Sequence, residues 1–173
     1  EYIDMLCKRI DDINTNLRGR YVRLLLHAPK TKAQKEALIM AVANKESYSR
    51  AAAYEMIKEV ELLKEDYTLV AEHLKFKSSE VRDHSLEIFI RQPEDNLTEC
   101  IKTMLCHKKE EMRLGGLDLI VRTKKDNTRK EYFNEIVTLA KLVEKPSEKE
   151  SIIINELCGD SKADEILNQE GYG

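Results

Sequence analysis

Glycine, proline and tryptophan are scarce in this chain, whose 173 residues include 6 Gly, 3 Pro and no Trp. Average usage would put glycine and proline together near 12% of a chain, so few residues here favour turns. Charged residues make up 35%, against an average of about 25%. A chain poor in turn formers and rich in solvated side chains is expected to be mainly helical.

Long hydrophobic runs are also missing. The longest, such as Leu24–Leu26 and Ile152–Ile154, are far shorter than the roughly 18 apolar residues that span a membrane. The chain starts at Glu1 and has no apolar signal segment. We therefore expect a soluble, cytoplasmic protein with no membrane partner, and we interpret residues 1–173 as a single domain cut from a longer polypeptide.

The four cysteines, Cys7, Cys100, Cys106 and Cys158, form no Cys-x-x-Cys pair and have no histidine at zinc-ligand spacing. This pattern argues against a metal site and against a disulfide scaffold, and it fits a reducing cytosol. A phosphate-binding loop, a nucleophile elbow and a zinc-binding His-Glu-x-x-His helix are absent from the sequence as well. We predict no metal, no cofactor and no enzymatic activity.

Charge is unevenly distributed, although the net charge is only −3. Residues 102–130 hold nine basic and four acidic residues, whereas residues 144–173 hold eight acidic residues and three lysines. The most basic stretch, 123–130, is expected to be an exposed loop between helices and the best site for a partner. The candidate partner-binding residues are Lys102, Lys108, Lys109, Lys124, Lys125, Arg129 and Lys130. An ordinary solvated surface is the alternative interpretation of the same residues.

An internal repeat begins at Arg50, Arg82 and Arg113, at intervals of 32 and 31 residues. In each copy the third residue after the arginine is small, and the fourth, sixth and seventh are bulky and mostly apolar. This spacing is typical of a helix packed closely on a neighbour. A weaker copy starts at Arg20 and is followed by Leu24 and Leu26 at the corresponding offsets.

A polar break and a second apolar-periodic stretch follow each arginine helix, which predicts helix–turn–helix units. Thr31-x-x-Gln34 and Ser147-x-x-Glu150 have the form of capping boxes at helix starts. Clear repeats cover 46–77, 78–108 and 109–143, with degenerate units at 1–45 and 147–173. The last unit is expected to pair 152–157 with 166–167 across a break at 159–161.

The runs Ser79-Glu80-Val81-Arg82 and Glu110-Glu111-Met112-Arg113 resemble short HEAT-like repeats of about 30 residues, of the phycobilisome-lyase type within the armadillo/HEAT superfamily. The resemblance implies an all-α fold, an α-solenoid of about five antiparallel helix pairs, and a role as a protein–protein interaction scaffold. One alternative is a nucleic-acid-binding module related to the alkylpurine DNA glycosylases, and another is a lyase or other enzyme. A basic patch formed by the residues of 102–130 would favour nucleic acid.

The same resemblance implies a polar ladder between repeats, in which arginines meet carboxylates or helix-end carbonyls. Its expected members are Arg50, Arg82, Arg113, Asp66, Asp95 and Asp126. Gly115-Gly116 in mid-helix predicts close approach of the preceding helix. The second helices are expected to line the partner surface with Glu72, His73, Lys75, Glu99, Lys102, Thr103, Glu135, Thr138 and Lys141.

Overall fold

The computed structural model describes the backbone of residues 2–169, together with the side chains of residues 2–158 except those at 11 and 16. All regular structure in this part of the chain is helical and none is strand, which confirms the all-α prediction. The chain divides into two compact units, Glu1–Phe89 and Ile90–Gly173, which are described separately. None of the described helices is both long and apolar enough to cross a membrane.

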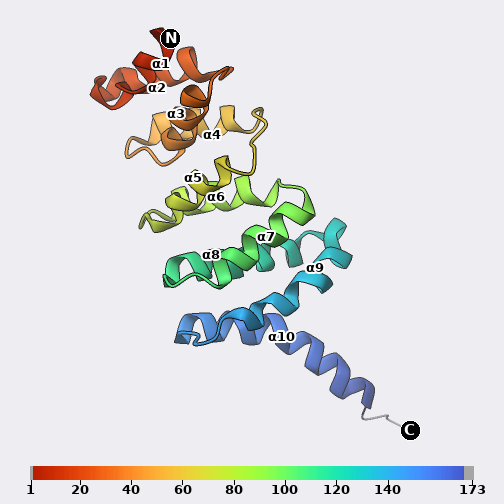
Figure 1. The fold of residues 1–173 in the computed structure, drawn as a ribbon. Coiled ribbons are helices and arrows are strands. Elements are labelled where there is room, and N and C mark those ends of the chain that lie inside the picture. Colours follow the sequence, from red (N-terminus) through yellow and green to blue (C-terminus); the bar gives the residue numbers. More distant parts are fainter. Residues whose placement is uncertain (1, 170–173) are drawn as a thin grey trace. The chain divides into compact units, whose positions relative to one another are not determined.

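In the first unit, α2 packs against α3 and α4, α3 packs against α4 and α5, and α1 packs against α3 (Figure 1). The elements are α1 (Tyr2–Cys7), the 3-10 turn η1 (Ile10–Asp12), α2 (Thr15–Leu26), α3 (Lys32–Val42), α4 (Ser47–Ile57), α5 (Asp66–Glu72), η2 (His73–Lys75) and α6 (Ser79–Ile90). The last residue of α6 belongs to the second unit.

In the second unit, α8 packs against α7, α9 and α10 (Figure 1). The elements are α7 (Glu94–Leu105), α8 (Glu110–Lys125), η3 (Asn127–Arg129), α9 (Lys130–Ile136), η4 (Val137–Leu142) and α10 (Glu148–Gln169). We call α2, α4, α6, α8 and α10 the first helices, and α3, α5, α7 and α9 the second helices. The ranges 46–77, 78–108 and 109–143 each contain one first and one second helix.

Side chains at the helix starts form the predicted caps. The backbone N–H of Gln34 donates to Thr31 Oγ1 at 3.3 Å. At α10, the N–H of Glu150 donates to Ser147 Oγ at 3.3 Å, and the N–H of Ser147 donates to the Glu150 carboxylate at 2.7 Å. These bonds satisfy amide groups that a helix start leaves without backbone partners.

Three expectations about local structure are wrong. The break expected at 159–161 lies within α10, whose backbone is helical from Glu148 to Gln169, so 147–169 holds one helix and not a pair. One glycine costs a helix only about 1 kcal/mol, which neighbouring helix-forming residues offset. The 123–130 segment is not a loop throughout, because α8 continues to Lys125 and buries Thr123. In the copy that starts at Arg20, Leu26 is fully buried but Leu24 is 77% exposed, so Leu24 does not take the place of the bulky core residue.

Gly116 lies where α8 crosses α7 closely, as predicted for the glycine pair. A Cβ at this position would lie 3.1 Å from Leu105 Cγ and 3.1 Å from Met104 Cβ. Leu105 is 1% exposed and Met104 is 3% exposed, so both side chains are held in the core. A larger residue therefore meets atoms that have little room to move.

His73 is a fully buried polar residue of the first unit. Ser85 Oγ donates to the carbonyl of Val81 at 2.7 Å, so it accepts from His73 Nδ1–H at 3.1 Å. This assigns the remaining lone pair to Nε2, which is buried without a hydrogen-bond partner. Burial lowers the pKa of His73 from 6.5 to about 4, because a charged imidazole would lose its hydration, and the nearby Glu72 opposes the shift only in part.

Gly116→Val is expected to lower the free energy of unfolding by about 1–3 kcal/mol, because the added methyl groups overpack the contact with Leu105 and Met104. Denaturant titration followed by circular dichroism measures the change. Ala51→Val, on the exposed surface of α4, is the control for valine in a helix. A Gly116→Val protein as stable as the parent would contradict the close packing.

His73→Leu is expected to flatten the acid side of the stability profile. The unfolded chain takes up a proton at His73 below pH 6.5 and the folded chain only near pH 4, so His73 destabilises the fold as pH falls between these values. The full effect is roughly 3 kcal/mol by linkage. Unfolding curves of both proteins from pH 7 to 4 give the difference. Parallel profiles would show that His73 is not buried in its neutral form.

Candidate interaction surfaces

Arg50, the fourth residue of α4, joins three segments of the first unit. Its Nη1 donates to the carbonyls of Asn44 at 2.8 Å and Lys45 at 3.3 Å, in the turn before α4. Its Nη2 pairs with the carboxylate of Glu80, in the first turn of α6. Because guanidinium is a planar donor with several N–H groups, one side chain fixes both the turn and the next first helix.

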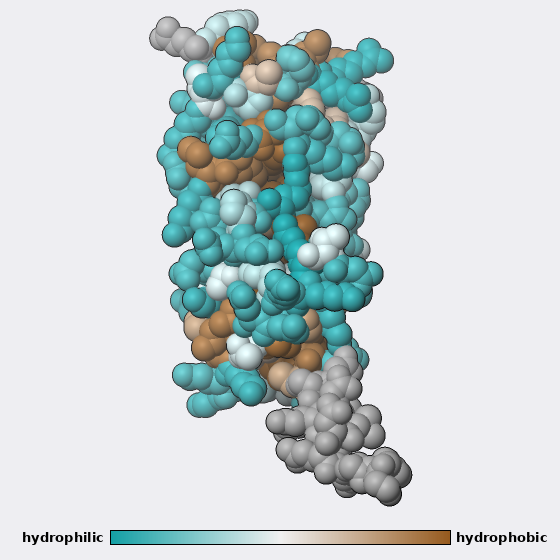
Figure 2. Space-filling model, turned by 90° about the vertical axis from the view of Figure 1, so that its right-hand side faces the viewer, coloured by the Kyte–Doolittle hydropathy of each residue, from teal (hydrophilic) through white to brown (hydrophobic). Residues whose placement is uncertain are grey.

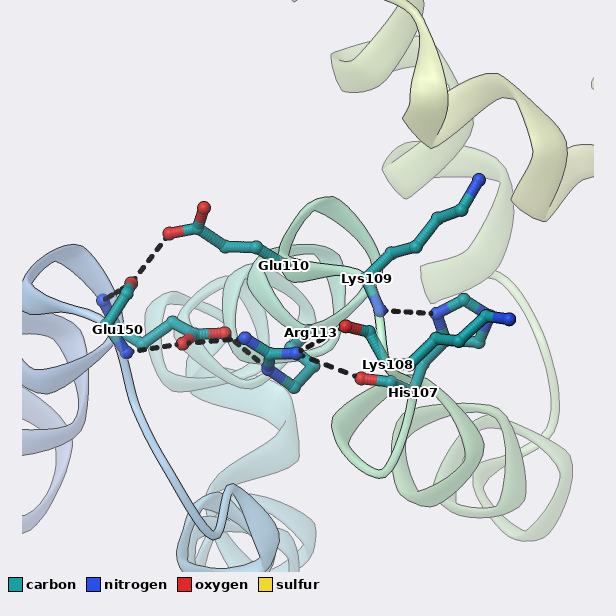
Figure 3. A network of polar contacts seen from close by, with 7 residues as sticks. His107, Lys108, Lys109, Glu110, Arg113 and Glu150 are labelled. Atoms are coloured by element: carbon teal, nitrogen blue, oxygen red, sulfur yellow. Dashed lines mark hydrogen bonds and ion pairs between the residues drawn. The ribbon is translucent and has the colours of Figure 1, made fainter.

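Arg113, the fourth residue of α8, makes the corresponding contacts in the second unit (Figure 3). Its Nη1 donates to the carbonyls of His107 and Lys108, each at 3.1 Å. Its Nε and Nη2 donate to the two carboxylate oxygens of Glu150, at 2.7 and 3.2 Å. Beside this pair, Ser147 Oγ donates to Glu110 at 2.6 Å, which further ties the start of α10 to α8.

Arg18 and Arg82 are likewise the fourth residues of α2 and α6. Arg18 donates to the carbonyl of Ile13 at 3.1 Å and to Asn44 Oδ1 at 3.5 Å. The Nε atoms of Arg18, Arg50 and Arg82 are all buried without a hydrogen-bond partner. The position in α2 that corresponds to the repeat arginine is thus Arg18 and not Arg20.

Of the three aspartates expected to meet Arg50, Arg82 and Arg113, Asp66 and Asp126 make other contacts. Asp66 accepts from the N–H of Leu63 at 2.8 Å and pairs with Lys35 at 3.2 Å. Asp126 accepts from the hydroxyl of Thr128 at 2.6 Å, and Asp95 is exposed at the start of α7.

The carboxylates that meet the arginines are Glu80 and Glu150, which sequence reasoning missed. Both are acidic residues in the first turn of a first helix, Glu80 in α6 and Glu150 in α10. This position in the sequence is the signal that identifies them.

Glu150 is charged although its side chain is fully buried. Burial by itself would raise the pKa of Glu150, but the hydrogen bonds from Arg113 and from the Ser147 backbone hold it below its ordinary value. A buried carboxylate in this setting depends on its partner, because removal of the cation leaves an uncompensated charge in the core.

The candidate basic residues do not form one patch. Lys102, Lys108 and Lys109 lie near the start of α8, whereas Lys124 and Lys125 lie in its last turn, about 20 Å away along the helix axis. Lys102 pairs with Glu99 at 3.1 Å. Arg129 donates to the carbonyl of Ile90 at 2.9 Å and is half-buried, while Lys125 and Lys130 are exposed.

Most of the residues that were expected to line the surface of the second helices are exposed. Glu72, Lys75, Glu99, Lys102, Thr103, Glu135, Thr138 and Lys141 are exposed. The prediction for His73 is wrong, because this residue lies in the core. On the face drawn in Figure 2, hydrophilic residues cover most of the surface and hydrophobic residues gather in separate patches.

A groove of about 630 Å³ runs along the second helix α3 in the first unit. Its lining includes Ala33, Ala37 and Met40 on α3, and Phe76 just after η2. Met40 is 50% exposed and Phe76 is 42% exposed, so apolar surface is open to solvent here. The remaining lining residues are Cys7, Lys8, Ile10, Arg18, Glu36, Ala41, Ala43, Asn44 and Lys45.

Three basic side chains also line this groove. Lys8 and Lys45 are exposed and Arg18 is half-buried, whereas the single carboxylate of the lining, Glu36, lies 3.8 Å from Lys32. The groove therefore combines an apolar floor with a positive rim. Among the described side chains, no group of three His, Cys, Asp or Glu residues is placed to hold a metal ion.

Residues 1–173, the whole chain, match the model of a protein family described as "Family of unknown function (DUF5724)". The chain belongs to this family. Neither the curated proteins nor the solved structures contain a match to this DUF5724 chain.

Arg113→Met is expected to lower the free energy of unfolding by about 3 kcal/mol, because Glu150 is left buried without its cation. Chemical denaturation at pH 7 measures the loss. Arg9→Met is the control, since Arg9 makes an exposed pair with Asp12 and its removal should cost at most about 0.5 kcal/mol. Equal losses in the two variants would contradict a structural role for the buried pair.

Proposed function

We propose that this chain is a HEAT-like α-solenoid whose stacked helix pairs form a scaffold for protein–protein interaction. The observation that supports the proposal is the recurrence of one arginine contact in both units. Arg50 reaches from α4 to α6, and Arg113 reaches from α8 to α10, each from the fourth helical residue. Contacts that repeat at one helical position are expected of an array of similar units.

The second helices supply the binding surface in this proposal. Arg50 and Arg113 join successive first helices through their N-terminal turns. The apolar groove with Met40 and Phe76 lies along the second helix α3. Exposed apolar surface framed by polar groups is typical of a protein-binding site. In the second unit, the exposed Lys125 in the last turn of α8 and the exposed Lys130 at the start of α9 offer a separate contact for an acidic partner.

Two further features favour a protein-binding role over a nucleic-acid-binding role. The net charge is −3, and the basic residues of 102–130 separate into two groups at opposite ends of α8. Duplex binding needs a basic surface that follows the phosphate backbone.

The buried thiol of Cys7 is not in a disulfide, which fits the proposed reducing, cytoplasmic setting.

The proposal predicts that the immobilised chain recovers specific proteins from extracts and that Met40→Asp or Phe76→Asp abolishes their recovery. A charge placed in the apolar groove opposes burial by a partner. Leu142→Asp is the control, because Leu142 is 39% exposed in the other unit, outside the groove. Quantitative mass spectrometry measures recovery, and circular dichroism checks that each variant is folded.

Two outcomes would contradict the proposal. One is equal recovery on the parent chain and on an unrelated helical bait. The other is retention of labelled duplex DNA at about 50 mM salt, which would favour the nucleic-acid alternative.

A further inference from the structure

Helix α2 is apolar on two opposite faces. Val22 and Leu26 are fully buried against the rest of the first unit. On the other side, Leu17, Tyr21 and Leu24 are 45%, 40% and 77% exposed. At 100° per residue these three lie within about 60° of one another, and their centre lies roughly opposite the buried pair. We call them the α2 stripe.

A helix with apolar residues on opposite sides is typical of a position between two neighbours. Helix α4 is such a case. It packs against α2 on one side and contacts α6 on the other, through Arg50–Glu80 and the stacked rings of Tyr54 and His84. Among the described helices, α2 has a first helix, α4, on one side only, and the α2 stripe faces away from the core.

The charges on α2 are all of one sign. Its sequence holds Arg18, Arg20 and Arg23 and no acidic residue. Arg20 is exposed and projects about 60° from Leu17, directly beside the stripe. Arg23 is also exposed, and its guanidinium lies 5.5 Å from the Tyr48 ring centroid. A helix that covers the stripe thus meets apolar side chains bordered by positive charge.

We infer that the α2 stripe docks an amphipathic α-helix of another protein, one that carries carboxylates beside its apolar face. The docked helix takes the position next to α2 that α6 takes next to α4. Its leucine-type side chains cover Leu17, Tyr21 and Leu24, and its carboxylates pair with Arg20. The inference rests on the proposed interaction function, but it uses a surface apart from the α3 groove.

The test uses fluorescence anisotropy with the full chain and a labelled 18-residue helical peptide. The peptide has leucines at positions i, i+3, i+4 and i+7 and glutamates beside them, and a second peptide has lysines in place of the glutamates. We expect the acidic peptide to bind at least tenfold more tightly than the basic one. Leu24→Asp should weaken binding of the acidic peptide at least tenfold, and Arg20→Glu at least fivefold.

Leu142→Asp is the matched control, because Leu142 is 39% exposed in the other unit, outside both the α2 stripe and the α3 groove, and should leave peptide binding unchanged. Since Leu24 is 77% exposed, Leu24→Asp is expected to keep the fold, which circular dichroism checks. Equal binding of the two peptides, or unchanged binding to Leu24→Asp, would overturn the inference.

Sedimentation equilibrium tests the other occupant of the α2 stripe, a second copy of this chain. We expect a monomer for the parent chain and for Leu24→Asp. An oligomer that Leu24→Asp dissociates would overturn the inference in favour of self-association. Loss of protein recovery by the groove variants, with no peptide binding, would refute the α2 inference alone and leave the proposed function standing.

Discussion

The organisation of both units depends on an arginine placed one turn into a first helix. The turn before such a helix presents backbone carbonyls that no helical amide satisfies, and the guanidinium of Arg50 or Arg113 donates to two of them. Its remaining donors meet a carboxylate in the first turn of the next first helix. One side chain thereby sets where its own helix begins and where the next one lies.

The polar side chains that hold the helices together are buried, and they are distinct from the side chains that solvent can reach. Glu150 is fully buried and committed to Arg113, and His73 is buried in its neutral form, so neither is available for binding. In the first unit, apolar surface is accessible in the α3 groove with Met40 and Phe76 and on the outward side of α2. Basic side chains border both: Lys8 and Lys45 at the groove, and Arg20 on α2.

The sequence carried enough information to predict an all-helical chain, but not to predict the partners of its arginines. Helical periodicity, the caps at Thr31 and Ser147 and the closeness at Gly116 follow from local rules and are found in the structure. The choice of Glu80 and Glu150 over the recurring aspartates depends on how helices cross, which spacing alone does not encode. Similarly, the burial of His73 and the exposure of Leu24 depend on tertiary neighbours. The backbone of α10 continues through Gly159, which shows that a single glycine does not end a long helix.

A pair of double-mutant cycles tests most directly whether the arginines join successive first helices. Arg113→Met with Glu150→Gln, and Arg50→Met with Glu80→Gln, give the coupling free energy of each pair from denaturant unfolding. We predict a coupling of about 2 kcal/mol or more for the pair with the buried Glu150, and about 0.5–1 kcal/mol for the pair whose Glu80 side chain is 48% exposed. Coupling near zero in both cycles would contradict the account.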